Sequence, residues 1–149
     1  MGKSDRIVPR LRPAPLHALV AACAASRGGL ALATFTPPDP SGYGRIVRDA
    51  AGEVAVIVEE RDASATQRAI RECNAGVYCA TASLLRAELP RLGSANAQGE
   101  IYLTDLVAVA AGQGGAGAVR VAADEVAGVN TREQLAALEA AARDESAGP

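Results

Sequence analysis

The spacing of apolar residues changes from helical to strand-like within the first third of the chain. Apolar side chains recur at helical spacing in residues 15–27, and the pair Gly28-Gly29 ends this pattern as a helix C-terminus commonly does. Residues 30–35 form a short apolar run that stops before two prolines, which is typical of a buried strand. The pattern therefore predicts a helix that is followed directly by a strand.

Two short apolar runs and a capping signal come next. Residues 45–47 contain the apolar pair Ile46-Val47, residues 54–58 are apolar, and the turn-forming residues 49–52 lie between them, so this stretch predicts a strand hairpin. Ser64 stands three residues before Gln67, which is the spacing of a capping box. This spacing predicts the start of a short helix that reaches residue 71.

The second half of the chain continues the alternation of strands and helices. The pattern predicts strands at 74–80 and 119–122, helices at 83–89 and 101–111, and a further helix whose capping box is Thr131 with Gln134. The helix at 101–111 is expected to bury one apolar face, made of Leu103, Leu106, Val107 and Ala110. Alternating strands and helices of this kind indicate an α/β fold.

The composition fits one compact domain with an aliphatic core. The chain has 149 residues, of which 49% are hydrophobic and only 3% aromatic, with no tryptophan. Its formal net charge is -2, which argues against a surface that neutralises nucleic-acid phosphates. No apolar run reaches membrane-spanning length and no secretory signal is recognisable. We therefore expect neither a nucleic-acid nor a membrane partner, and a cytoplasmic location.

Cysteine and histidine offer little to a catalytic or metal site. The three cysteines, Cys23, Cys73 and Cys79, form no C-x-x-C pair and are expected to be small buried side chains. The single histidine, His17, falls within the first predicted helix and is expected on its surface, which leaves a nucleophilic triad without its base. Any chemistry would therefore depend on carboxylates, amides, backbone N–H groups and a bound cation.

Gly112, Gly114 and Gly117 satisfy the G-x-G-x-x-G pattern of dinucleotide-binding loops. In such loops a strand turns into a helix whose N-terminus faces the pyrophosphate. Here a helix is predicted before the glycines and a strand after them. We therefore interpret this segment as a flexible surface connection.

Polar residues at predicted strand ends are better candidates for binding. The glycines of the loop at 41–45 permit a ligand to approach backbone N–H groups. Glu59 follows a predicted strand, where its carboxylate is either a solvated charge or an acceptor for two sugar hydroxyls. Asn74 begins another strand, and Asn130 precedes a capped helix, so Asn130 is either a cap or a ligand.

Five separated stretches carry a family resemblance. They read D-P-S-G-Y-G-R-I at 39–46, I-V-E at 57–59, N-A-G at 74–76, N-A-Q-G-E-I-Y-L-T-D at 96–105 and V-A-G-V-N at 126–130. In this order and spacing they resemble the bacterial bifunctional N-acetylglucosamine-1-phosphate uridylyltransferases, which are also glucosamine-1-phosphate acetyltransferases. The resemblance implies an incomplete doubly wound nucleotidyltransferase domain of Rossmann-like type, with a mixed sheet and flanking helices.

The resemblance also implies a reaction. The family joins UTP to N-acetylglucosamine 1-phosphate and releases pyrophosphate, in the synthesis of peptidoglycan and lipopolysaccharide precursors. UTP, the UDP-sugar and the amino-sugar 1-phosphate are therefore the expected ligands, and magnesium is the expected metal.

Carried over to this sequence, the family's binding residues are Gly44, Glu59, Asn74, Tyr102, Thr104 and Asn130. The glycine would offer its backbone to the sugar, Glu59 would bind sugar hydroxyls, and Asn74 would hold the sugar from another side. The tyrosine and the threonine would lie near the acetamido group. Asn130 would bind magnesium and touch the nucleotide sugar.

The sequence departs from the family pattern at its start. No stretch matches the family's L-x-A-G-x-G-T-R-M loop, which holds the nucleoside triphosphate, and Ile7 stands where the resemblance requires the metal-binding aspartate. Asp5 is two residues away, roughly 6–7 Å along a strand and too far to replace a ligand at about 2.1 Å. The magnesium site is therefore expected to be incomplete.

These departures divide the chain into three parts: a poorly matched basic segment at 1–12, the C-terminal, sugar-binding part of the nucleotidyltransferase domain at 13–143, and a flexible tail at 144–149. The acetyltransferase β-helix of the family has no counterpart here, so no trimer is expected. We expect a fragment of the uridylyltransferase domain that is inactive alone. A non-catalytic sugar-phosphate-binding module and a truncated reading frame without a separate role stay open as alternatives.

Overall fold

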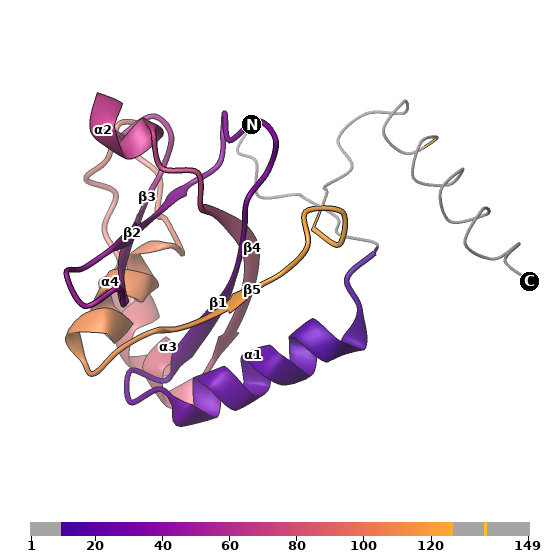
Figure 1. Ribbon diagram of the computed structural model, residues 1–149. Helices are drawn as coiled ribbons and strands as arrows, with labels where there is room; N and C mark the ends of the chain where they lie inside the picture. The colour runs from indigo at the N-terminus through magenta and orange to yellow at the C-terminus, as the bar shows by residue number, and fades with distance from the viewer. Residues whose placement is uncertain (1–9, 127–135, 137–149) are drawn as a thin grey trace, which may run out of the picture.

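The computed structural model describes residues 10–126 and residue 136 of the chain. They contain one mixed sheet of five strands in the order β3-β2-β4-β1-β5 (Figure 1). The strands are β1 (Leu30–Phe35), β2 (Arg45–Arg48), β3 (Val54–Val58), β4 (Cys73–Ala80) and β5 (Gly117–Arg120). β5 runs parallel to β1, whereas β4 is antiparallel to both β1 and β2, and β2 is antiparallel to β3.

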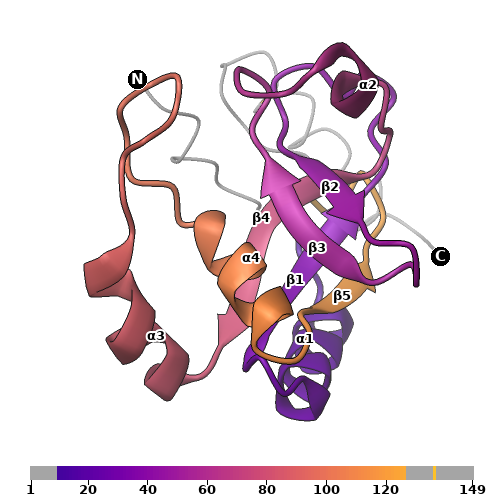
Figure 2. The same cartoon turned by 90° about the vertical axis from the view of Figure 1, so that its left-hand side faces the viewer.

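Helices cover both faces of this sheet. α1 (Pro13–Ala25) packs against β1, β4 and β5, and α4 (Asp105–Gly112) packs against β3. α3 (Ala82–Glu88) continues into a short 3-10 turn, η1 (Leu89–Arg91), and the one-turn α2 (Ala65–Arg68) contacts β2. Figure 2 shows α1 and α3 on opposite sides of the sheet.

The strand β1 is buried on both faces and therefore joins the two halves of the core. Leu30 and Leu32 pack with residues of α3 and α4, whereas Ala31, Ala33 and Phe35 pack with residues of α1. All six residues of β1 are buried. This double burial accounts for the unbroken apolar run in its sequence.

The first predicted elements are confirmed. The helix predicted at 15–27 is α1, the strand predicted at 30–35 is β1, and the predicted hairpin consists of β2 and β3. The capping box is present, since the Ser64 hydroxyl accepts a hydrogen bond from the Gln67 amide at 3.2 Å and the Gln67 side chain accepts one from the Ser64 amide at 2.9 Å. The helix that this box begins ends at Arg68, earlier than expected.

The helix predicted at 101–111 begins later than expected. Its first residue is Asp105, and the turn ahead of it is closed by a hydrogen bond from the Asp105 amide to the Tyr102 carbonyl. Leu103 is 49% exposed, so its assignment to the buried face is wrong. Thr104, which is 8% exposed, takes the inward position, and its direct neighbour consequently points outward. The remaining residues of the expected face are buried, namely Leu106, Val107 and Ala110.

The last predicted strand is displaced by two residues. β5 pairs in parallel with residues 31–34 of β1, and the pairing begins at Gly117 rather than at residue 119. A Cβ atom at Gly117 would approach Ala22 of α1 to 3.1 Å, so glycine allows the helix to lie close to this strand. Gly112 ends α4 and Gly117 begins β5, which confirms that the three-glycine segment joins a helix to a strand.

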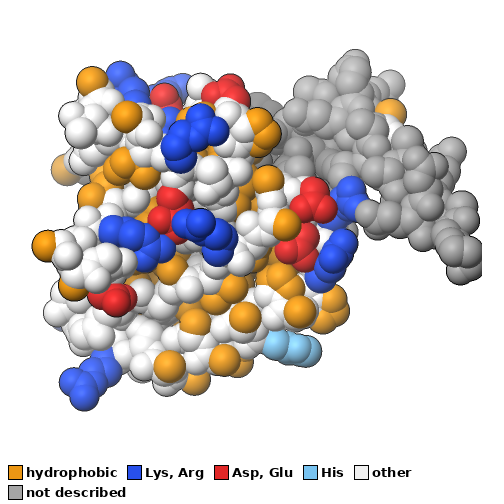
Figure 3. Space-filling view, viewed as in Figure 1, with side chains coloured by type: hydrophobic (Ala, Val, Ile, Leu, Met, Phe, Trp, Pro, Cys, Tyr) orange, Lys and Arg blue, Asp and Glu red, His pale blue; other side chains and the backbone are white. Residues whose placement is uncertain are grey.

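The histidine and two of the three cysteines lie where the sequence predicts. His17 is exposed on α1, Cys23 and Cys73 are buried, and Cys79 is half-buried; all three cysteines are free thiols. α1 also presents hydrophobic side chains at the surface (Figure 3), where Val20 is 59% exposed. In the part of the chain that the structure describes, no helix is long and apolar enough to cross a membrane.

Three expectations fall outside the described residues. They concern the capping box of Thr131 with Gln134, the tail at 144–149 and most of the basic segment at 1–12. The division of the chain into these parts therefore stays a prediction.

Candidate functional site

Polar residues singled out by the sequence meet where the hairpin of β2 and β3 joins the rest of the sheet. The register between β2 and β4 consists of the pair Arg45↔Cys73, at the start of both strands. Gly44 directly precedes β2, and Asn74 is the second residue of β4. The backbone N–H of Asn74 donates a hydrogen bond to the Gly44 carbonyl at 2.9 Å, so these two strand starts lie side by side.

Glu59 lies on the other side of Gly44. It follows the last residue of β3, which pairs with Arg45 at the start of β2. A Cβ atom at Gly44 would stand 3.3 Å from Glu59 Oε1 and 2.7 Å from Ile57 Cγ2. Because glycine has no side chain, the Glu59 carboxylate can lie close to the backbone at this position. Glu59 Oε1 also accepts a hydrogen bond from the Thr104 hydroxyl at 3.2 Å. We refer to these connected residues as the candidate site: Gly44, Glu59, Asn74 and Thr104.

Both ends of the Asn74 carboxamide are engaged. Its Oδ1 accepts a hydrogen bond from the Gly76 amide at 2.9 Å, and its Nδ2 donates to the Tyr78 hydroxyl at 2.6 Å. Gly76 has a φ of 77°, and around it the register of β1 with β4 jumps from Leu32↔Tyr78 to Thr34↔Asn74. Two steps along β1 thus oppose four steps along β4, which is a bulge, and it contains the turn that holds Asn74.

A loop from the motif at 96–105 lies beside the candidate site. The Ala97 amide donates to Asp62 Oδ1 at 2.8 Å, and Gln98 Nε2 donates to the Tyr102 hydroxyl at 2.8 Å. The pKa of Tyr102 is raised, first by loss of hydration and then by the charges of Asp62 and Glu59. Tyr102 therefore lies within the electrostatic reach of the candidate site.

The Glu59 carboxyl has a raised pKa. Burial is the largest cause, because a partly buried carboxylate loses hydration, and the negative charges of Asp62 and Asp105 act in the same direction. The hydrogen bond from Thr104 opposes this shift, since it favours the ionised form. The pKa of Tyr78 is raised as well, first by burial and further by the charge of Glu59, so its hydroxyl is protonated at neutral pH.

An ion pair beneath the candidate site holds its two strand ends together. Arg45 Nη2 lies 2.7 Å from Glu60 Oε2, and Arg45 is only 2% exposed. The Gly42 amide donates to the same carboxylate oxygen at 3.3 Å. The pair therefore joins the glycine-rich loop to the residue after Glu59 and keeps Gly44 and Glu59 in contact.

The structure brings together most of the residues predicted for the site. Gly44, Glu59, Asn74 and Thr104 are connected by the contacts described above. Tyr102 lies on the neighbouring loop, and Asn130 is outside the described residues. The binding roles of all six stay predictions.

Two residues of this neighbourhood, Tyr78 and Asp62, are not predicted from the sequence. The available signal for Tyr78 is its position four residues after Asn74 on one strand, with a glycine between them that permits a bulge. Asp62 has no comparable signal, because its contact with Ala97 joins positions that are 35 residues apart.

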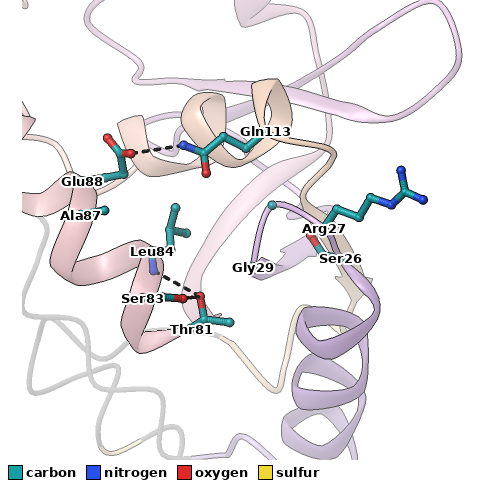
Figure 4. A pocket seen from close by; sticks show the side chains of 10 residues that line it. Ser26, Arg27, Gly29, Thr81, Ser83, Leu84, Ala87, Glu88 and Gln113 are labelled. Atoms are coloured by element: carbon teal, nitrogen blue, oxygen red, sulfur yellow. Dashed lines mark hydrogen bonds between the residues drawn. The ribbon is translucent and has the colours of Figure 1, made fainter.

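A separate cavity lies at the other end of β1 and β4 (Figure 4). It measures about 370 Å³ and is lined by the loop after α1, the start of α3 and the end of α4. On its rim, Gln113 Nε2 donates a hydrogen bond to Glu88 Oε1 at 3.2 Å, and Thr81 Oγ1 accepts one from the Leu84 amide at 3.3 Å. None of the five predicted site residues that the structure describes lines this cavity.

The chain has the fold of the nucleotidyltransferase class. Its structure is similar to that of a putative glucose-1-phosphate thymidylyltransferase from Bacillus anthracis, with a TM-score of 0.61 and 17% sequence identity. The similarity covers 87% of this chain and 49% of that one, and at this identity it shows the shared fold alone. The expected nucleotidyltransferase fold, a mixed sheet with flanking helices, is thereby confirmed.

Sequence comparison identifies the family within this class. The chain is 53% identical over 128 residues to the bifunctional protein GlmU of Anaeromyxobacter dehalogenans strain 2CP-C, and 52% identical over 136 residues to that of Chromohalobacter salexigens. These matches cover 86% and 90% of this chain but only 26% and 30% of the two relatives. No protein-family model matches the chain. The chain belongs to the GlmU family and spans less than a third of the length of these relatives, which confirms the resemblance found in the motifs.

Proposed function

We propose that this chain provides the sugar-phosphate side of a uridylyltransferase site. The proposed reaction joins UTP to N-acetylglucosamine 1-phosphate, yields UDP-N-acetylglucosamine and releases pyrophosphate. One observation carries the proposal: Glu59, Gly44 and Asn74 come from three separate segments and lie next to one another. The product would serve the synthesis of peptidoglycan and lipopolysaccharide precursors.

The candidate site has the donors and acceptors that a sugar requires. A carboxylate accepts hydrogen bonds from two neighbouring hydroxyls, and Glu59 Oε2 would take this part while Oε1 holds Thr104. Asn74 can both donate and accept, from an amide whose orientation is already set. Gly44 would add a backbone N–H, and Tyr102 with Thr104 would contact the acetamido group.

The contribution of these residues to the reaction would be positional. An oxygen of the sugar phosphate attacks the α-phosphorus of UTP in line, and pyrophosphate leaves. A phosphate oxygen is already ionised at neutral pH, so the attack needs no base from the protein. By holding the sugar ring, the candidate site would keep that oxygen in the direction of attack.

Magnesium neutralises charge in this class of reaction. In the part of the chain that the structure describes, the residues do not fit a complete magnesium site. Among the described residues no group of three or more His, Cys, Asp or Glu side chains is placed to hold a metal ion, and Ile7 stands where the family resemblance requires an aspartate. Asn130, the proposed ligand, offers only an amide, which is a weak ligand for a hard cation.

Isothermal titration calorimetry with N-acetylglucosamine 1-phosphate tests the binding half of the proposal. We expect the wild-type chain to bind, and Glu59→Ala and Asn74→Ala each to weaken binding by about tenfold or more, because each removes hydrogen bonds to the sugar. Ser83→Ala is a suitable control, since its exposed hydroxyl contacts Thr81 beside the other cavity. Heat absent from the wild-type chain would overturn the proposal.

Release of pyrophosphate from UTP, the sugar phosphate and magnesium tests the catalytic half. We expect none from the isolated chain, because its 149 residues contain no L-x-A-G-x-G-T-R-M loop. Binding without turnover favours a non-catalytic sugar-phosphate-binding module or a part of a larger site. Absence of both sugar-phosphate binding and turnover favours a chain without a separate role. Rapid turnover by the isolated chain would refute the inactivity proposed here.

A further inference from the structure

We propose that Tyr78 is a positioning residue that fixes the orientation of the Asn74 carboxamide. The geometry points to this role through two hydrogen bonds: Asn74 Nδ2 donates to the Tyr78 hydroxyl at 2.6 Å, and Asn74 Oδ1 accepts from the Gly76 amide at 2.9 Å. The consequence for sugar binding rests on the proposed function, whereas the orientation itself does not.

The bond from the Gly76 amide selects one of the two orientations of the carboxamide, and the bond to Tyr78 then holds the carboxamide in that orientation. The Gly76 backbone N–H can only donate, so Oδ1 must face it, and Nδ2 must then face the tyrosine. If the amide turned by half a rotation, two N–H donors would oppose each other at Gly76. Tyr78 accepts the bond on the other side and removes the freedom that the short Gly76 turn alone would leave.

Tyr78 is itself held firmly. Its ring packs against the core cluster that contains Leu30 and Leu32 of β1 and Leu106 of α4. Burial raises the pKa of its hydroxyl, so this group stays protonated at physiological pH and its oxygen can accept the hydrogen bond from Asn74. A ring anchored in the core thus connects the rigid centre of the sheet to a side chain of the candidate site.

The position of Tyr78 is also tied to Glu59. The charge of Glu59 acts on the Tyr78 hydroxyl and raises its pKa in the same sense as burial does. The tyrosine hydroxyl therefore contacts one of the two side chains that are proposed to hold the sugar and lies in the electrostatic field of the other. Loss of its hydroxyl removes a single contact, because phenylalanine fills the same space in the core.

The first arm of the test needs no ligand. NMR of the uniformly nitrogen-15-labelled chain reports the side-chain amide protons of Asn74 and their mobility. We expect the wild-type amide to be rigid with a hydrogen-bonded proton shifted downfield, and Tyr78→Phe to move that proton toward its solvent-exposed shift and to increase its mobility. An unchanged Asn74 amide in Tyr78→Phe would overturn the proposal.

The second arm is a double-mutant cycle on affinity for N-acetylglucosamine 1-phosphate. Tyr78→Phe is expected to weaken binding by about threefold to tenfold, the value of one hydrogen bond, in a chain whose melting temperature shows it to be folded. In an Asn74→Ala background the same change is expected to have no further effect. An equal loss in both backgrounds would show that Tyr78 acts independently of Asn74 and would overturn the proposal.

A matched control and a distinct outcome separate this proposal from the proposed function. Ser26→Ala also removes an ordered hydroxyl, one that donates to the Gly115 carbonyl at the other end of the sheet, and it is expected to leave affinity unchanged. If the wild-type chain binds no sugar phosphate while the NMR change is observed, the sugar role fails and the positioning of Asn74 by Tyr78 stands.

Discussion

The two ends of the central strands use glycine in opposite ways. At the end that carries the cavity, a Cβ atom at Gly28 would stand 2.2 Å from the Ala110 carbonyl oxygen and 2.3 Å from that of Gly115. At the candidate site, a Cβ atom at Gly44 would meet side-chain atoms instead, Ile57 Cγ2 at 2.7 Å and Glu59 Oε1 at 3.3 Å. Backbone cannot turn aside, whereas side chains can. The first glycine is therefore required by packing, and the second keeps a carboxylate close to a backbone.

The hydrogen bonds at the two ends also differ in the groups that make them: backbone carbonyls accept near the cavity, and side chains take part at the candidate site. Near the cavity, the Ser26 hydroxyl donates to the Gly115 carbonyl at 2.5 Å, and the Thr81 amide donates to the Gly29 carbonyl at 2.8 Å. The three-glycine segment is thus hydrogen-bonded to the loop after α1. The sequence predicts a flexible connection there, whereas the structure shows one that is fixed by this contact. At the candidate site the contacts involve carboxylate, hydroxyl and amide side chains, which have capacity for a ligand as well.

The strongest way to break this comparison is Gly28→Ala. The new methyl group would collide with two backbone carbonyls, so we expect a loss of about 3 kcal/mol in the free energy of unfolding. Urea denaturation measures this loss. Gly93→Ala is the control, because no atom lies within 4 Å of a Cβ built there. Equal stability of the two variants would contradict the packing role of Gly28.

The second prediction concerns the ion pair beneath the candidate site. Glu60→Gln would remove the negative charge that lies 2.7 Å from the guanidinium of Arg45, a residue that is 2% exposed. The carbonyl acceptors of this guanidinium would remain, and about 2 kcal/mol of stability is expected to be lost. Arg91→Gln breaks a pair with Glu88 in which the arginine side chain is 73% exposed, and Gln113 still donates to the carboxylate, so this change is expected to cost about 0.5 kcal/mol or less. Thermal unfolding compares the two, and similar losses would argue against a buried clamp.

The third prediction changes binding more than stability. In Gly44→Ala, Ile57 and Glu59 can turn away from the new methyl group, so the fold is expected to survive while the carboxylate is displaced. Affinity for N-acetylglucosamine 1-phosphate is expected to fall by about tenfold, or ~1.4 kcal/mol. Calorimetry measures it, with Gly93→Ala again as the reference. Unchanged affinity would show that Gly44 plays no part in holding Glu59 for a ligand.

The smallest expected effect is a pH dependence that arises from Glu59. Burial raises its pKa in the folded chain above the ordinary value of 4.5, so the folded state binds this proton more tightly than the unfolded state. Stability is therefore lost as pH rises through the window between these two values. Glu59→Gln has no such proton. Its stability relative to the wild-type chain is therefore expected to increase as pH rises through that window, and this relative gain is expected to be absent below the window.

Melting temperatures of both proteins between about pH 4 and pH 8 measure this difference. Glu53→Gln controls for the removal of a negative charge, since Glu53 is exposed in the turn between β2 and β3. A stability difference that stays constant over the whole range would contradict the burial of the Glu59 carboxyl.

Local pattern was enough to predict elements whose cause is local. The strand at 30–35 was predictable because burial on both faces requires an unbroken apolar run, and the capping box because Ser64 and Gln67 satisfy each other. The start of α4 was not predictable from local pattern, since Ile101 and Leu103 continue the apolar spacing although both are exposed. The contact of Thr104 with Glu59, 45 residues away, decides which side chain turns inward.

The amino-acid sequence by itself determined the order of helices and strands, the family and the chemical types present in the candidate site. Apolar spacing, caps and motifs act over a few residues and are legible in one dimension. Only the tertiary structure decided that Gly44 lies between Glu59 and Asn74, and that a bulge at Gly76 brings Tyr78 to the Asn74 amide. Strand register and burial set these neighbours, because they depend on contacts between segments that are distant along the chain.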